Sequence, residues 1–162
     1  MSRFRRTSKI LFLAGILCLG LTGVSPGQPR GRDSTPFSIK IHTPRSVVKT
    51  GSALRVSVEI KNTSNADIHY GGGVPIVDPA VWDFEGKPAH ETALKRKLWS
   101  QSAPSLLVLL TLHPDQTYES TLEIGKLYDL TKPGKYNIQV QRRDLDTRIL
   151  VKSNTITVRV RR

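Results

Sequence analysis

The chain has 162 residues, in which 25 Lys and Arg face 13 Asp and Glu, and it contains a single cysteine. This length fits one domain that can bury a core without covalent crosslinks, and one cysteine excludes an intramolecular disulfide or a thiolate metal cluster. The formal charge of +12 favours attraction to polyanions. Basic and aromatic residues do not interleave as they do in nucleic-acid-binding modules, so we do not expect nucleic acid as a partner.

The first 27 residues predict a secretory signal peptide. Four cations between residues 3 and 9 precede an uncharged apolar run over residues 10–24. This run is shorter than the roughly 20 residues that a membrane-spanning helix needs, and it fits the apolar region of a signal peptide. We expect cleavage before Gln28, with an uncleaved anchor as the alternative. Lipidation of Cys18 is not expected, because the bulky leucine before it does not fit a lipidation motif.

Cleavage leaves a mature chain of 135 residues in which 21 cations face 13 acids, a formal charge of +8. Residues 28–36 are rich in Pro, Gly, Arg and Ser and predict a flexible linker. Residues 37–162 predict one folded domain, free of cysteine. The signal implies a secreted protein, periplasmic or extracellular, with no membrane span after cleavage, and we expect a monomer.

Short alternating segments follow in chain order. Residues 37–42 alternate apolar and polar side chains, as a half-buried first strand does. Residues 54–61 show the same pattern most clearly, and residues 68–70 and 81–84 predict two further strands. Residues 89–99 fit either a loop or a short helix.

The second half of the chain continues this rhythm. Residues 106–112 form an apolar run that predicts a strand buried on both faces. An alternating strand ends near Ile124, and residues 126–130 predict one helical turn. The last two strands are expected over residues 135–143 and 149–161.

A tyrosine near the C-terminus indicates how the strands are arranged. A Pro-Gly turn at residues 133–134 precedes Tyr136, which enters a late strand. This is the position of the tyrosine corner of immunoglobulin-like sandwiches, so we expect its hydroxyl to bond to backbone near Leu130 or Lys132. The whole pattern predicts an all-β fold, a two-sheet antiparallel immunoglobulin-like sandwich of seven to eight strands.

Four segments carry a resemblance to known domains: SVVKTGS at residues 46–52, KNTS at 61–64, DFEGK at 83–87 and LYDLTKPGKY at 127–136. With them the sequence resembles bacterial secreted immunoglobulin-like or fibronectin-type domains. It is distantly similar to BsuPI-type proteinase inhibitor domains and to deuterolysin propeptide-like domains. These are turn and strand motifs, so the resemblance implies a fold rather than an activity.

The sequence offers no recognisable catalytic or metal-binding pattern. No two of the histidines stand at the spacing of a zinc-binding helix or strand; they are His42, His69, His90 and His113. No Gly-x-Ser-x-Gly motif is present, and the mature chain has no thiol. We therefore expect no enzyme activity, no metal and no cofactor.

One cationic run lies beside a tryptophan and is the candidate contact site. Lys95, Arg96 and Lys97 precede Trp99 in the irregular middle segment. Arg and Trp are common interface anchors, so one interpretation is that this exposed run contacts an anionic glycan, a lipid headgroup or an envelope protein. In the alternative, Trp99 packs under the sandwich and the three cations are merely solvated. Trp82 is expected in the core.

A second basic group depends on how the last strands pair. Residues 142–143 would join Arg159 and residues 161–162 if these strands form a hairpin. The sequence thus favours a secreted non-enzymatic binding or accessory domain of the bacterial envelope. The alternative is a proteinase inhibitor that acts through an exposed loop, at residues 71–80 or 100–105.

Overall fold

The structure, a computed structural model, describes residues 35–70, 76–100 and 110–162. The predicted signal peptide, most of the predicted linker and the first part of the predicted strand at 106–112 lie outside these residues. All of the described residues belong to one compact unit.

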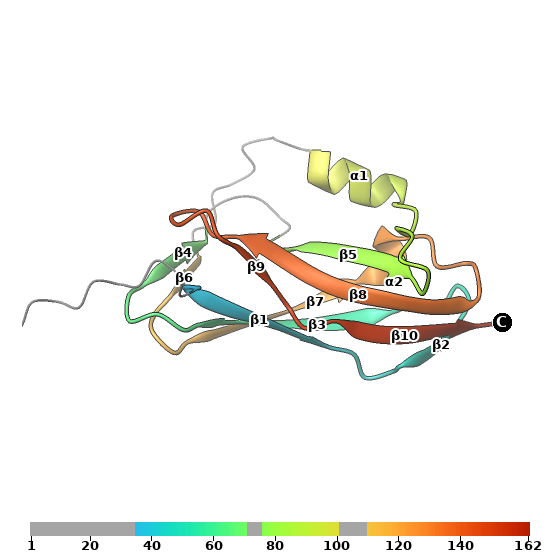
Figure 1. Cartoon of the computed structure of the whole chain (residues 1–162), viewed down its shortest axis with the longest axis horizontal. Helices are drawn as coiled ribbons and strands as arrows, with labels where there is room; N and C mark the ends of the chain where they lie inside the picture. Colours follow the sequence, from blue (N-terminus) through green and yellow to red (C-terminus); the bar gives the residue numbers. More distant parts are fainter. Residues whose placement is uncertain (1–34, 71–75, 101–109) are drawn as a thin grey trace, which may run out of the picture. The chain divides into compact units, whose positions relative to one another are not determined.

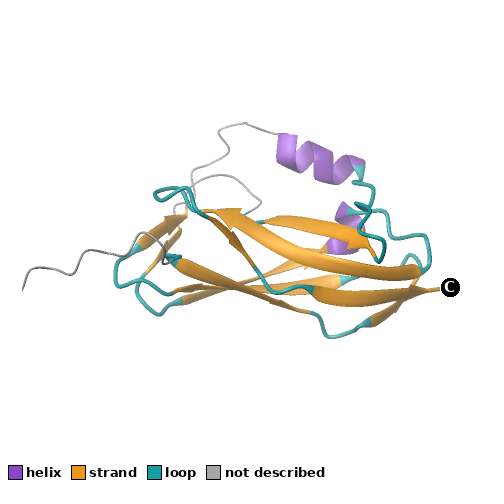
Figure 2. Cartoon of the chain, in the orientation of Figure 1, coloured by secondary structure: helices purple, strands orange, loops and turns teal. Residues whose placement is uncertain are grey.

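Strands dominate the described part of the chain, and two short helices accompany them there (Figure 2). The strands are β1 Phe37–His42, β2 Val47–Lys49, β3 Arg55–Asn62, β4 Ile68–Tyr70, β5 Asp78–Asp83, β6 Leu110–Leu112, β7 Thr117–Glu123, β8 Gly134–Arg143, β9 Leu150–Lys152 and β10 Ile156–Arg161. The helices are α1 Ala93–Ser100 and α2 Ile124–Leu127.

Two sheets form a sandwich, as Figure 1 shows. The first sheet has the order β1-β3-β7, and the second has the order β2-β10-β8-β5, with β9 also paired to β8. Strands β4 and β6 form a separate two-stranded ribbon. The predicted all-β immunoglobulin-like sandwich is confirmed. The described residues contain ten strands instead of the seven to eight expected. The pairing is also not antiparallel throughout, because β2 joins β10 in parallel and so carries the N-terminal chain from the first sheet to the second.

The predicted last strand at 149–161 is split into β9 and β10 by a local rearrangement. The hydroxyl of buried Ser153 accepts the backbone N–H of Val140 at 2.9 Å. The side chain of Asn154 binds both backbone groups of Ile41 in β1, at 2.8 and 3.0 Å. Side-chain bonds therefore replace part of the backbone ladder here and tie the two sheets together.

The core follows from the alternation of the strands. In β3, Val56, Val58 and Ile60 are buried, while the residues between them are half-buried. In β8, Ile138 and Val140 are fully buried and face the other sheet's apolar side chains in one cluster. Each such side chain contributes about 1.5–3 kcal/mol by leaving water.

The predicted tyrosine corner is confirmed. Tyr136 is 7% exposed, and its hydroxyl donates to the carbonyl oxygen of Lys132 at 2.9 Å.

Replacing Tyr136 by Phe removes the hydroxyl bond to Lys132 and should lower the free energy of unfolding by about 1 kcal/mol. Urea denaturation measures the effect. The control is Tyr118→Phe, which removes the hydroxyl of a half-buried tyrosine in β7. An equal loss of unfolding free energy in both variants would contradict the role of the Tyr136 hydroxyl.

Candidate functional site

Residues 89–99 fitted either a loop or a short helix, and the structure shows helix α1 over Ala93–Ser100. Thr92 precedes it and accepts the backbone N–H of Lys95 through its hydroxyl, at 3.2 Å, as an N-cap does. The same hydroxyl donates to the carbonyl oxygen of Lys126 at 2.7 Å, which joins the start of α1 to α2. The run of Ala, Leu, Lys and Arg that follows has a high helix propensity.

Lys95 is buried, and its ammonium group is surrounded by acceptors. Its side chain is 6% exposed, and Nζ lies 2.6 Å from the Glu91 carboxylate and 3.6 Å from that of Asp78. Nζ also donates to the carbonyl oxygen of Pro79 at 3.1 Å and contacts the hydroxyl of Tyr128. Burial alone would lower the pKa of Lys95, but the bonds to Glu91 and Tyr128 and the charge of Asp78 outweigh it and raise that pKa.

This arrangement covers the free edge of β5. Strand β5 ends the second sheet, so carbonyl groups on its outer side have no neighbouring strand among the described residues. The carbonyl of Pro79 accepts from both Lys95 and Tyr128, and that of Val81 accepts the N–H of Ala89 at 2.9 Å. Figure 1 shows α1 alongside β5. Because its own chain covers these groups, this edge cannot add a strand from a partner.

The expectation that Lys95, Arg96 and Lys97 form one solvated cluster is wrong for Lys95. Arg96 and Lys97 are exposed, whereas Lys95 is buried and Trp99 is half-buried. Residues four apart share one face of a helix, so Lys95 and Trp99 both turn inward, and Nζ lies 5.4 Å from the centre of the Trp99 ring. Trp99 packs against the core, as the alternative expected.

A turn that precedes α1 holds the most exposed large apolar side chain among the described residues. Phe84 is 71% exposed. The Asp83 carboxylate accepts the N–H groups of Glu85 and Lys87 at 3.0 and 2.9 Å, and the N–H of Gly86 bonds to the Asp83 carbonyl at 3.1 Å. Gly86 has φ of +83°, a conformation that favours glycine. The turn is therefore tightly organised around Asp83.

Sequence reasoning missed this exposure. The alternation of Trp82 and Phe84 predicted a strand through residue 84, with Trp82 in the core, but β5 ends at Asp83 and Trp82 is half-buried. An Asp at the first position of a turn and a Gly at the fourth are typical of a type I turn, and Asp83 and Gly86 match that pattern. The signal was present in the sequence.

The second basic group does not assemble as expected. The last strands do pair, but Arg142 and Arg143 lie opposite β9, away from the β10 residues that pair with the start of β8. The Arg142 guanidinium lies 4.4 Å from the centre of the Tyr70 ring and donates to the carbonyl of Ile76. Arg142 thus packs over an aromatic ring.

Three buried tyrosines predict a loss of stability at alkaline pH. Burial raises the pKa of Tyr70, of Tyr128 and of Tyr136 in the folded state. Their stabilising contribution is complete below the unfolded pKa of about 10 and is lost as pH rises, because the unfolded chain releases protons that the folded one retains.

The melting midpoint should therefore fall from about pH 10 upward. Thermal unfolding followed by circular dichroism across neutral to alkaline pH measures this. Tyr70→Phe should make the decline shallower. A midpoint that stays constant well above pH 10 would contradict the burial of these hydroxyls.

The described residues contain no group of three His, Cys, Asp or Glu that could hold a metal ion. Two histidines make polar contacts: His113 with Asp67 at 2.9 Å, and His69 with Thr111 at 3.1 Å.

Within residues 35–70, 76–100 and 110–162, no helix combines the length and apolar character needed to cross a membrane.

A hollow of about 210 Å³ lies between β2, α2 and the segment after α2. The Asp129 carboxylate at its rim already accepts the N–H and hydroxyl of Thr131, at 3.0 and 2.7 Å, and these bonds lower the pKa of Asp129. The carboxylate in the lining of this hollow is therefore already hydrogen-bonded within its own loop.

Comparison with models of known protein families gives no match. Comparison with characterised proteins by sequence also gives none. Among solved structures, a mutant β-glucosidase from Listeria innocua in complex with laminaribiose matches 78% of this chain at a TM-score of 0.46 and 15% identity. The CARDB domain of a Pyrococcus furiosus protein in complex with di-metal ions matches 77% at 0.45 and 14%.

A β-glucosidase from Erythrobacter marinus matches 77% of this chain at a TM-score of 0.43 and 16% identity. The chain spans 16% of the length of the Listeria enzyme, 15% of the Erythrobacter enzyme and 87% of the CARDB domain. Matches at these identities and TM-scores do not extend the glucosidase activity or the metal ions to this chain.

Proposed function

We propose that this chain is an exported, non-enzymatic accessory domain that binds a protein partner through the turn at residues 83–88. The observation that carries the proposal is Phe84, an aromatic side chain 71% exposed on a turn held by hydrogen bonds. Phe, Tyr and Trp side chains dominate interface energetics, and a preorganised turn loses little conformational entropy on binding.

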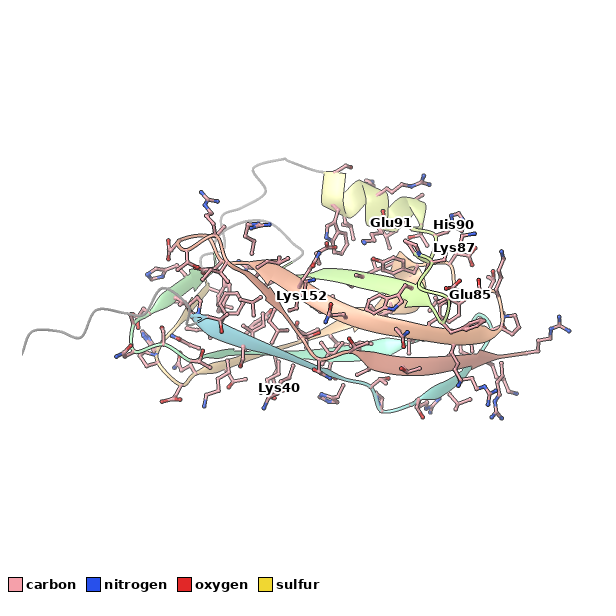
Figure 3. The ribbon with its side chains drawn as sticks, viewed as in Figure 1. Lys40, Glu85, Lys87, His90, Glu91 and Lys152 are labelled. Atoms are coloured by element: carbon pink, nitrogen blue, oxygen red, sulfur yellow. The ribbon has the colours of Figure 1, made fainter. Side chains whose placement is uncertain are left out.

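Helix α1, which follows the turn in the chain, also presents side chains to solvent. Leu94 on α1 is 42% exposed, and Arg96 and Lys97 on the same helix are exposed to solvent. Figure 3 shows Lys87 and Glu91 along the segment that connects the turn to α1. An apolar anchor with a charged rim is the usual composition of a transient protein interface.

Site-specific photo-crosslinking in the parent organism tests this proposal. A photoreactive phenylalanine analogue at position 84 should give a discrete crosslinked species, identified by mass spectrometry. The same analogue at Leu145, which is 45% exposed in the β8–β9 connection, is the matched control. Identical adducts from both positions would contradict a role for the turn.

The same turn supports the second candidate, a proteinase inhibitor. Of the loops first considered, residues 71–75 and 101–105 lie outside the described residues, and residues 78–80 belong to β5. An exposed Phe on an ordered turn has the form of a side chain presented to a protease that cleaves after aromatic residues.

Inhibition of chymotrypsin and of trypsin by the purified domain tests this candidate. Phe84→Lys should transfer inhibition from chymotrypsin to trypsin, because the residue at the tip would set specificity. Inhibition unaffected by Phe84→Lys, or absent in the parent, would exclude the inhibitor role.

Export rests on the predicted leader alone. Mass spectrometry of the natively produced protein should find an N-terminus near Gln28, and a species that begins at Met1 would contradict cleavage.

A further inference from the structure

Four cations lie on the outer side of the second sheet, at one end. In β10, Val158 and Val160 point into the core, so Arg159 and Arg161 point outward. Lys135 in β8 and Lys49 in β2 alternate in the same way with buried neighbours, and all four side chains are exposed. These four residues, Lys49, Lys135, Arg159 and Arg161, are called the basic face below.

The strand register places these cations beside one another. Arg159 lies directly opposite Lys135, and Arg161 lies beside Lys49 in the parallel pair. Neighbouring strands are about 4.8 Å apart, and like charges directly opposite each other are destabilising. None of the salt bridges in the described part of the chain involves these four residues. No carboxylate of the described residues therefore lies within salt-bridge distance of these four cations.

We propose that the basic face binds an anionic polysaccharide. A linear polyanion would neutralise the facing cations and relieve their repulsion. The next row of the same sheet face is polar and uncharged: Thr157 donates to the Asn137 side chain at 2.7 Å, and Trp82 lies opposite Asn137. Amide, hydroxyl and aromatic groups suit sugar hydroxyls and ring faces.

A lipid surface fits this face less well. Among the strands that carry the basic face, Val47 is the one exposed large apolar residue, at 45%. Peripheral membrane binding draws on apolar side chains that enter the headgroup region, and one valine supplies little of that area.

Binding to immobilised heparin and to polygalacturonate, with neutral dextran as a blank, tests the proposal over a salt series. The basic-face variant carries Lys49→Gln, Lys135→Gln, Arg159→Gln and Arg161→Gln. The matched control carries Lys40→Gln, Arg143→Gln, Arg148→Gln and Lys152→Gln, which removes the same charge from exposed positions outside the basic face and the proposed contact surface. Figure 3 labels Lys40 in β1 and Lys152 in β9, two of these control positions.

The parent should bind at least one of the two polyanions at low salt and release it as salt rises, since exposed charges are screened beyond about 8 Å at physiological salt. The basic-face variant should lose at least about tenfold in affinity and the control less than about twofold. The basic-face variant should also melt no lower than the parent, because a like-charge contact has been removed.

Equal loss in both variants would overturn the proposal in favour of net charge alone. Absence of parent binding at low salt would overturn it as well. Binding to phosphatidylglycerol vesicles without binding to either polysaccharide would replace it by a membrane surface. Phe84→Ser should leave polysaccharide binding intact, so this test and the test of the turn at residues 83–88 can fail separately.

Discussion

Replacing Lys95 by alanine is expected to lower the free energy of unfolding by about 2–3 kcal/mol. The change removes the donor that serves the Pro79 carbonyl, the Tyr128 hydroxyl and the Glu91 carboxylate. Removing one partner of a fully buried ion pair costs about 3–5 kcal/mol. The Glu91 side chain is 45% exposed, so water compensates part of the loss.

Lys97→Ala is the matched control, because Lys97 is exposed on the same helix and should change stability by less than about 0.5 kcal/mol. Urea denaturation of both variants gives the comparison. The raised pKa of Lys95 means that its contribution is complete below the unfolded value of about 10.4 and is lost as pH rises above it. Equal stability of the two variants would show that Lys95 does not hold α1 against β5.

Ile138→Ala should lower the free energy of unfolding by about 2–5 kcal/mol, the largest effect expected in this domain. Ile138 is fully buried in the middle of β8 and lies opposite Val81 on one side and Ile156 on the other. Strands on both sides hold the site in place, so the structure cannot collapse into the cavity that the shorter side chain leaves.

The control for this prediction is Lys135→Ala on the same strand. It removes an exposed side chain and relieves the contact with Arg159, so this variant should be at least as stable as the parent. Urea denaturation of both variants, with the midpoint and slope of each curve, measures the difference in their unfolding free energies. If Ile138→Ala unfolds at the same urea concentration as Lys135→Ala, β8 does not occupy the centre of the sandwich.

Local pattern was enough to predict much of the fold. The alternation in residues 37–42 and 54–61 recurs in β1 and β3, since the side chains of a strand point to opposite faces in turn. The Pro-Gly turn before Tyr136 predicted a hydroxyl bond to backbone near Leu130 or Lys132, and the structure contains the bond to Lys132. Both features depend on residues close together in the chain, which is why the sequence by itself determined them.

The tertiary structure decided which charged residues reach solvent and which of them meet. Lys95 is buried because helix periodicity turns it toward β5, and acceptors from residues distant in the chain, such as Pro79 and Tyr128, surround it there. Arg159 faces Lys135 rather than Arg142 because of the register between β8 and β10. Register and helix docking arise from packing between distant segments, which composition and local periodicity do not encode.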